Sequence, residues 1–159
     1  MAQKRFVRRG VAKVFYLPTV ANPTVGPTRA EVTAGLDVTD WLSEMAGFVV
    51  NSGTIPTPDM GNRFTSTIPG ETTVDDSTLT FWDDELTEEI EEAFPIDDIG
   101  FVYFMRKGDK PATPTGDLFP TRVGSRSANW TTDMAGATVA VTFSITAPPS
   151  LDTNIPAAA

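Results

Sequence analysis

The sequence contains no cysteine and no histidine among its 159 residues. It therefore has no thiol nucleophile, imidazole base or disulfide, and no zinc site of the usual kind. The glycine-rich loops of nucleotide-binding proteins and the G-x-S-x-G motif of serine hydrolases are also missing. Catalysis would have to rest on carboxylate, lysine, serine or tyrosine chemistry, and we expect a protein that is not an enzyme and holds no cofactor.

Long apolar runs are absent as well. No stretch of about twenty residues is continuously apolar, and Lys13 interrupts the apolar residues that follow the basic amino terminus. We expect a protein without membrane anchor or export signal, made in the cytoplasm. A hydrophobic fraction of 40%, with ten Phe and three Trp, is enough for one packed domain despite the net charge of −9.

Basic residues are missing from the segment between Phe64 and Met105, whereas eleven of the 21 acidic residues lie between Asp75 and Asp98. Neighbours in sequence cannot neutralise these carboxylates. Two interpretations stay open: a solvated acidic face, or a surface on which a basic segment of another subunit docks. The obvious basic segment is the amino-terminal arm, with Lys4, Arg5, Arg8 and Arg9.

A period of two dominates the pattern of apolar residues and predicts a mainly β protein. The clearest strand is 138–146, and weaker strand signals lie at 11–17, 48–50, 64–68, 77–82 and 121–126. Residues 101–105 are apolar on both alternating faces, which indicates either a central strand covered on both sides or part of a subunit contact.

Two stretches have helical spacing instead. In 37–46, Val38, Trp41, Leu42 and Met45 fall at i, i+3, i+4 and i+7. In 84–94, acidic residues fill the first turn and Pro95 follows the end. The sequence predicts a helix over each range, and the exposed face of the second would carry like charges four residues apart.

Residues 51–73 contain three prolines and several turn residues, but Ile55, Met60, Phe64 and Ile68 argue against a simple linker. Long weakly structured insertions in compact domains are usually functional or disordered. We expect either a hairpin-like extension that reaches a neighbouring molecule or a loop that folds back on its own domain. The tail, 148–159, should be extended or disordered in an isolated monomer.

The paired acids Asp75-Asp76, Asp83-Asp84 and Asp97-Asp98 match no EF-hand, and adjacent acids on a strand point to opposite faces. Turn and helix-start positions explain the last two pairs, so we expect no metal site and no glycosidase-type pair. The arm KRFVRR is compatible with phosphate contacts, yet the pI near 4.3 opposes specific binding of nucleic acid. Arg122 and Arg126 fall on one face of a strand signal and suit a subunit contact.

Three segments together resemble the major tail protein, the tail tube subunit of long-tailed bacteriophages. They are PTRAEVTAGLDVTDWLSEMAGF (27–48), NSGTIPTPDMGNRFTSTIPGETTVDDSTLTFWDD (51–84) and GFVYFMRKG (100–108), and the resemblance covers about 11–147. It implies a β-sandwich or barrel-like fold with one flanking helix, a long inter-strand loop and extended termini. Such subunits form hexameric rings that stack into a tube, and their inner strands line the lumen through which the genome passes.

The resemblance also implies a location in the virion tail after synthesis in the bacterial host. The implied partners are further copies of the chain, the tape measure protein, the tail tip or baseplate and the tail terminator, with DNA sliding through without specific binding. We divide the chain into a basic arm (1–10), a β domain (11–147) with the long loop (51–73) and acidic helix (84–94), and a tail (148–159). The residues expected at contacts between subunits are Lys4, Arg5, Arg8, Arg9, Ile55, Met60, Arg63, Phe64, Glu88, Glu92, Arg122 and Arg126.

Two other classes of function are compatible with the sequence. A monomeric or low-order binding module, such as a virion decoration protein, has the same β-rich composition. An enzyme that uses paired carboxylates would need only acids of the kind present here. Assembly that depends on concentration separates the tube subunit from the decoration module.

Overall fold

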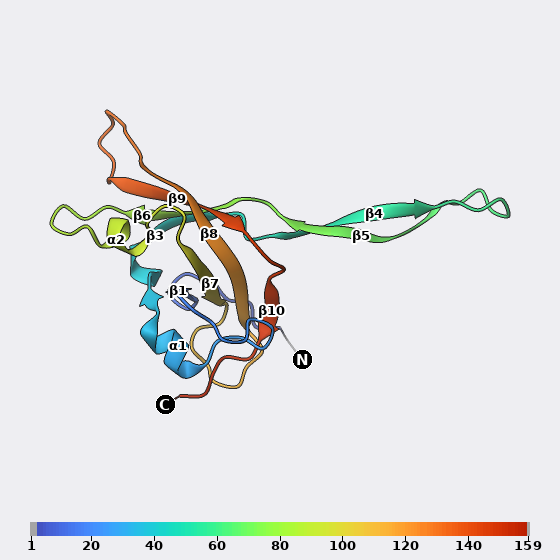
Figure 1. Cartoon of the computed structure of the whole chain (residues 1–159), viewed down its shortest axis with the longest axis horizontal. Helices are drawn as coiled ribbons and strands as arrows, with labels where there is room; N and C mark the ends of the chain where they lie inside the picture. Colours follow the sequence, from blue (N-terminus) through green and yellow to red (C-terminus); the bar gives the residue numbers. More distant parts are fainter. Residues whose placement is uncertain (1–2, 159) are drawn as a thin grey trace.

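A computed structural model describes residues 3–158 as one antiparallel β sheet with a projecting β hairpin (Figure 1). The sheet order is β2-β1-β7-β8-β9-β6-β3, with β10 also paired to β8, and β4 and β5 form the hairpin. The strands are β1 (Lys13–Leu17), β2 (Leu36–Asp37), β3 (Leu42–Ala46), β4 (Val50–Thr57), β5 (Ser66–Val74), β6 (Ser77–Trp82), β7 (Ile99–Met105), β8 (Gly116–Ala128), β9 (Thr138–Ile145) and β10 (Ser150–Thr153). The helices are α1 (Arg29–Ala34), the short 3-10 helix η1 (Thr39–Trp41) and α2 (Glu89–Ala93). The mainly β prediction is confirmed.

The sheet curls so that strands from both of its ends share one core. The main hydrophobic cluster takes Val14 from β1, Phe81 from β6 and Phe143 from β9, with Phe94 after α2 closing it. A second cluster, which includes Leu17, Tyr103 and Ile155, lies on the other face of β1 and β7. Together the two clusters give the domain the apolar burial that stabilises it.

Strand β7 is covered on both faces, as one of the two interpretations of 101–105 proposed. Val102 and Phe104 pack with the main cluster, whereas Tyr103 and Met105 belong to the second. The strand pairs with β1 on one side and with β8 on the other. Its apolar character on both faces therefore follows from burial within one chain.

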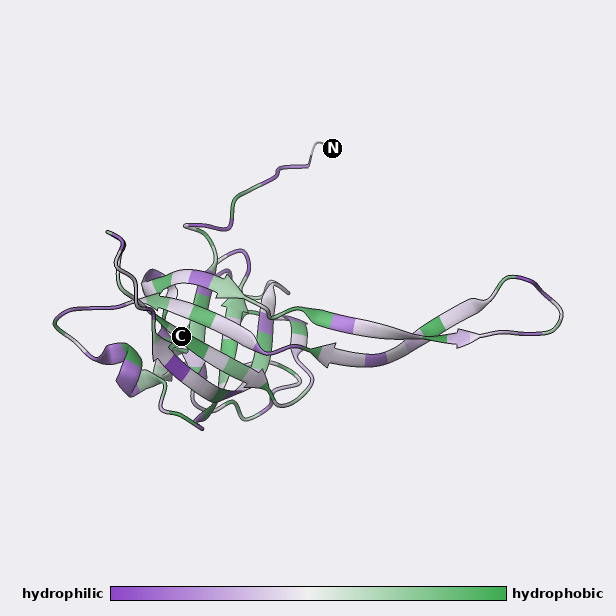
Figure 2. Ribbon diagram, turned by 90° about the horizontal axis from the view of Figure 1, so that it is seen from above, coloured by the Kyte–Doolittle hydropathy of each residue, from purple (hydrophilic) through white to green (hydrophobic). Residues whose placement is uncertain are grey.

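Strands β3 and β6 continue beyond the sheet as β4 and β5, so residues 42–82 form one long ribbon with a break. At the break, Gly47 and Phe48 have φ angles of 85° and 58°. The Phe48 ring packs against Phe104 and Phe119, and its backbone N–H donates to Ser77 Oγ at 2.8 Å. The base of the hairpin is thus fixed in the core, while its distal part extends away from the body (Figures 1 and 2).

The predicted helix over 37–46 is wrong. The segment contains β2, the single 3-10 turn η1 and the edge strand β3, which pairs with β6. Val38 is buried, but Met45, at the end of the supposed apolar stripe, is 52% exposed. Backbone pairing with β6 outweighs the local periodicity, because a short isolated helix gains little without an apolar face to bury.

Helix α1 was not predicted. Thr28 caps it: the Thr28 side chain accepts from the Glu31 N–H, and the Glu31 carboxylate accepts from the Thr28 N–H at 2.7 Å. This reciprocal capping box holds two otherwise unpaired N–H groups at the helix start. Val32 then packs into the second cluster.

Helix α2 covers only the end of the predicted range 84–94. Asp84 instead accepts a hydrogen bond from the Leu86 N–H at 2.8 Å, and Leu86 is 91% exposed. The side chain thus competes with helical bonding where like charges already disfavour a helix. Ile90 and Phe94 are buried as expected, and Arg126 donates to the carbonyl oxygens of Glu91 and Phe94 at the helix end.

The carboxy-terminal segment is extended, as predicted, but it is held on the body. Strand β10 pairs with β8, and the side chain of Ile155 is 1% exposed. Arg29 donates to both carboxylate oxygens of Asp109 at 2.8 Å and to the carbonyl oxygens of Pro156 and Ala157 at 2.6 and 3.0 Å. One guanidinium therefore ties this segment to helix α1 and to the β7–β8 loop.

Candidate assembly surfaces

The β4–β5 hairpin exposes apolar side chains that nothing in the described chain covers. Ile55 and Ile68 lie opposite each other in the ribbon and are each 51% exposed. At the tip, Met60 is fully exposed and Phe64 is 72% exposed. Exposed apolar groups gathered on one projecting element are typical of an interaction surface.

The edges of the hairpin are protected against pairing with another strand. Pro56 lies in β4 opposite Thr67, and Pro69 lies in β5 opposite Thr54. Proline has no N–H, and in strands it occupies positions whose N–H would point away from the ladder. Each strand of the ribbon thus lacks one N–H donor for the addition of a further strand. The hairpin is therefore suited to contacts through its faces and tip.

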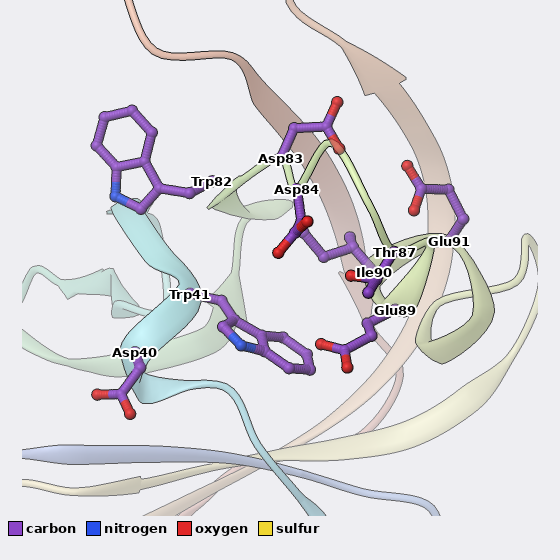
Figure 3. Close-up of a pocket in the computed structure, with 9 residues that line it drawn as sticks. All are labelled: Asp40, Trp41, Trp82, Asp83, Asp84, Thr87, Glu89, Ile90 and Glu91. Atoms are coloured by element: carbon purple, nitrogen blue, oxygen red, sulfur yellow. The ribbon is translucent and has the colours of Figure 1, made fainter.

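A small cleft lies between η1, the end of β6 and α2 (Figure 3). We call it the tryptophan cleft, because its walls include the indoles of Trp41 and Trp82. Its volume is about 130 Å³, and its lining is completed by Asp40, Asp83, Asp84, Thr87, Glu89, Ile90 and Glu91. Within residues 3–158, none of its five carboxylates forms a salt bridge. The Trp41 indole lies beside Glu89 in Figure 3, whereas the Trp82 ring is turned away from the carboxylates. The cleft thus combines one aromatic face with uncompensated negative charge.

The outer face of the acidic segment is also exposed, and it includes the predicted contact residues Glu88 and Glu92. In Figure 2 this segment lies at the end of the molecule opposite the hairpin tip. The amino-terminal arm runs away from the body on a third side, and its predicted residues Lys4, Arg5, Arg8 and Arg9 are all exposed. The chain does not bring its own arm and acidic segment together.

The two arginines of β8 do not share a face, contrary to the sequence interpretation. A bulge between Val123 and Ser125 adds one residue, so Arg122 pairs with Ser144 and Arg126 with Val141. Because neighbouring residues of a strand point to opposite faces, the extra residue inverts the alternation. Arg126 holds the end of α2, while Arg122 is exposed and lies 3.4 Å from Asp97.

Residues 3–158 contain no group of three or more acidic side chains placed to hold a metal ion. None of the helices in this described range is long and apolar enough to cross a membrane. Burial and a hydrogen bond to Asp98 raise the pKa of Tyr16 above its usual range. That hydroxyl is therefore protonated at ordinary pH and donates to the carboxylate as a structural bond.

Comparison with solved structures shows the same fold in other assemblies. A chain in the cryo-EM structure of the anti-feeding prophage baseplate superposes with a TM-score of 0.58 at 7% identity, over 92% of this chain and 95% of that one. A chain from the tube-terminating cap of that prophage superposes with a TM-score of 0.58 at 13% identity, over 90% of this chain and 89% of that one. A chain from the tail of an empty GTA particle superposes with a TM-score of 0.52 at 8% identity, over 89% of this chain and 93% of that one.

No curated protein sequence matches the chain. A protein-family model matches the chain over almost its whole length. The match includes the arm, the body, the hairpin and the carboxy-terminal segment. The matched range is residues 1–158, and the family is described as phage tail tube protein. This chain therefore belongs to the phage tail tube protein family.

Proposed function

We propose that this tail tube subunit assembles into hexameric rings, which stack into a tube that conducts the phage genome during ejection. The single observation that carries the proposal is the projecting hairpin with its exposed Ile55, Met60, Phe64 and Ile68. A two-stranded hairpin is only marginally stable alone in water, so its apolar side chains need a partner surface. In a tube, that partner is another copy of the chain.

Six-fold symmetry is supported by the proteins that share the fold. The anti-feeding prophage baseplate is described as six-fold symmetrised, and the GTA tail has C6 symmetry. Closed rings would also cover the open edge of the sheet at β3, whose residues are mostly exposed. An open edge left in solution invites uncontrolled strand pairing, and ring closure removes it.

The charge distribution supports a role for the arm between subunits. Four basic residues lie on the exposed arm, and the carboxylates of Glu88 and Glu92 lie on the far acidic segment. A chain that cannot join these two surfaces internally can pair them with a neighbour, and the attraction would weaken with salt. Removal of 1–9 should impair tube formation while the monomer stays folded.

The surplus of carboxylates also suits a conduit for DNA. A subset of them facing the lumen would repel phosphate and let the polymer slide without a specific grip. The tape measure protein, the tail tip or baseplate and the tail terminator would meet the tube inside or at its ends. Synthesis in the host cytoplasm precedes assembly in this scheme.

Electron microscopy of the purified protein over a concentration series tests the proposal. We expect rings or hollow tubes with six-fold symmetry, in growing proportion as concentration rises. Small particles at every concentration, also after addition of tail tip components, would contradict it. A lumen wall with net positive charge in an assembled structure would contradict only the proposal that repulsion lets the DNA slide, and not the proposed rings and tube.

A further inference from the structure

The hairpin tip is a shaped knob with one guanidinium, from Arg63, and one carboxylate, from Asp59. Asp59 Oδ1 accepts from the Gly61 N–H at 2.8 Å, and Asn62 Oδ1 accepts from the Phe64 N–H at 3.0 Å, so two side chains hold the turn. Arg63 is exposed next to Phe64 and is the only basic residue between Arg29 and Arg106. The knob thus presents a guanidinium together with the exposed side chains of Met60 and Phe64.

The tryptophan cleft has the complementary character. Its indoles come from η1 and the end of β6, and its carboxylates come largely from the segment that leads into α2 and from α2 itself (Figure 3). A guanidinium stacks on an indole face and can donate to a carboxylate at the same time.

We propose that Arg63 at the hairpin tip of one subunit enters the tryptophan cleft of a second copy of the chain. Arg63 would stack on Trp41 and pair with Glu89, which lie side by side in Figure 3, while Met60 and Phe64 pack around the rim. This inference rests on the proposed function, because it names the contact by which one ring holds the next. The small cleft suits one side chain better than a long segment such as the arm.

The placement of the two surfaces determines what kind of contact they make. The tip and the cleft lie at opposite ends of the long axis, so a chain cannot fill its own cleft (Figures 1 and 2). A contact between two different patches of identical subunits is heterologous, and it repeats without closing when the subunits are arranged along an axis. Such a contact extends a stack of rings and gives the tube a direction.

Charge reversal at the tip tests the contact. Arg63→Glu should leave a folded monomer that still forms rings, while mean tube length falls at least tenfold in electron micrographs. Lys107→Glu makes the same change of charge at another exposed position and should give tubes of normal length. The double variant Arg63→Glu with Glu89→Arg should restore part of the length. Normal tubes from Arg63→Glu would overturn the inference but leave the proposed function intact.

The absence of cysteine allows a direct test of proximity. Oxidation of Met60→Cys with Thr87→Cys keeps Arg63 and Glu89 and should yield a ladder of covalent oligomers, because each chain offers one thiol at each end. Lys107→Cys with Thr87→Cys should give no ladder above dimer. A ladder from Arg5→Cys with Thr87→Cys, and none from the tip pair, would assign the cleft to the arm and overturn the inference. A wild-type protein that forms no assembly, also after addition of tail tip components, contradicts both proposals.

Discussion

The body and the hairpin are both antiparallel β structure, but they differ in what covers their side chains. In β6 and β9, apolar residues alternate with less buried ones, and Phe81 and Phe143 have no exposed surface. In β4 and β5 nearly every residue is exposed, including a directly opposed pair of isoleucines. The body covers its apolar side chains with its own residues, whereas those of the hairpin can be covered only by contacts with another molecule. Folding and assembly are therefore separate demands on the two regions.

The largest expected effect on stability comes from removing an aromatic side chain from the core of the body. Phe94 is fully buried, and its ring centroid lies 4.7 Å from that of Tyr16 and 5.1 Å from that of Phe81. Phe94→Ala should lower the free energy of unfolding by about 3–5 kcal/mol, because it removes buried area and leaves a cavity. Chemical denaturation of the monomer measures this.

The matched control is the same substitution at the hairpin tip. Phe64→Ala, at a side chain that is 72% exposed, should change monomer stability by less than about 0.5 kcal/mol. Equal losses from both substitutions would break the comparison, since they would mean that the hairpin is part of the core.

A second substitution addresses the junction between the two regions. A Cβ on Gly47 would lie 2.8 Å from Ser77 Cα, and the residue has a φ of 85°, where side chains are strained. Gly47→Ala should cost about 1–3 kcal/mol by denaturation, because the backbone of two strands must shift. Gly53→Ala in the hairpin is the control, since its nearest neighbour would be 3.4 Å away. A cost at Gly53 as large as at Gly47 would contradict the junction as a fixed point.

The sequence predicted well those elements whose pattern and environment agree. Strand β6 occupies the predicted range 77–82, and β9 ends one residue before the predicted limit. Both strands have one face in the core and pair with a neighbouring strand on each side. The alternation of apolar residues is therefore enough to locate them in the sequence. For the hairpin, apolar residues among prolines indicated an extension, but they gave only short strand signals, because exposed strands do not need to alternate.

Errors arose where long-range pairing or a single backbone feature decides the outcome. The spacing of Val38, Trp41 and Leu42 fits a helix, yet pairing of β3 with β6 determines that region. The bulge at Gly124 reverses the facing of Arg126, and its local signal is a single glycine within the strand pattern. Helix α1, in contrast, had a readable signal in Thr28 and Glu31, a threonine followed three residues later by glutamate. The tryptophan cleft joins residues about forty positions apart, so the sequence alone could not predict it.

The carboxy-terminal segment is intermediate between the two regions, since it is exposed in part but held by Arg29. The guanidinium of Arg29 beside Asp109 lowers the pKa of that carboxyl, so the bond stabilises the fold above the ordinary pKa of 3.8 and is lost as pH falls below it. Because both side chains are partly exposed, the effect should be no more than about 1 kcal/mol. Asp109→Asn should reduce the loss of stability between pH 5 and about pH 2, and Arg29→Gln should reduce it equally. Unchanged acid titration in both variants would show that the ion pair of Arg29 with Asp109 does not stabilise the fold.

The smallest effect on folding should come from the hairpin face itself, and it separates the two demands most sharply. Ile55 and Ile68 are half-exposed, so Ile55→Thr with Ile68→Thr removes little buried area in the monomer and keeps β-branched side chains on both strands. We expect a change below about 0.5 kcal/mol in the unfolding free energy, together with a clear rise in the concentration needed for tubes. Val14→Thr, in the core, should do the opposite, with a destabilised body as the primary defect. If the hairpin variant unfolded early but assembled normally, the hairpin would belong to the fold and its exposed face would not be an assembly surface.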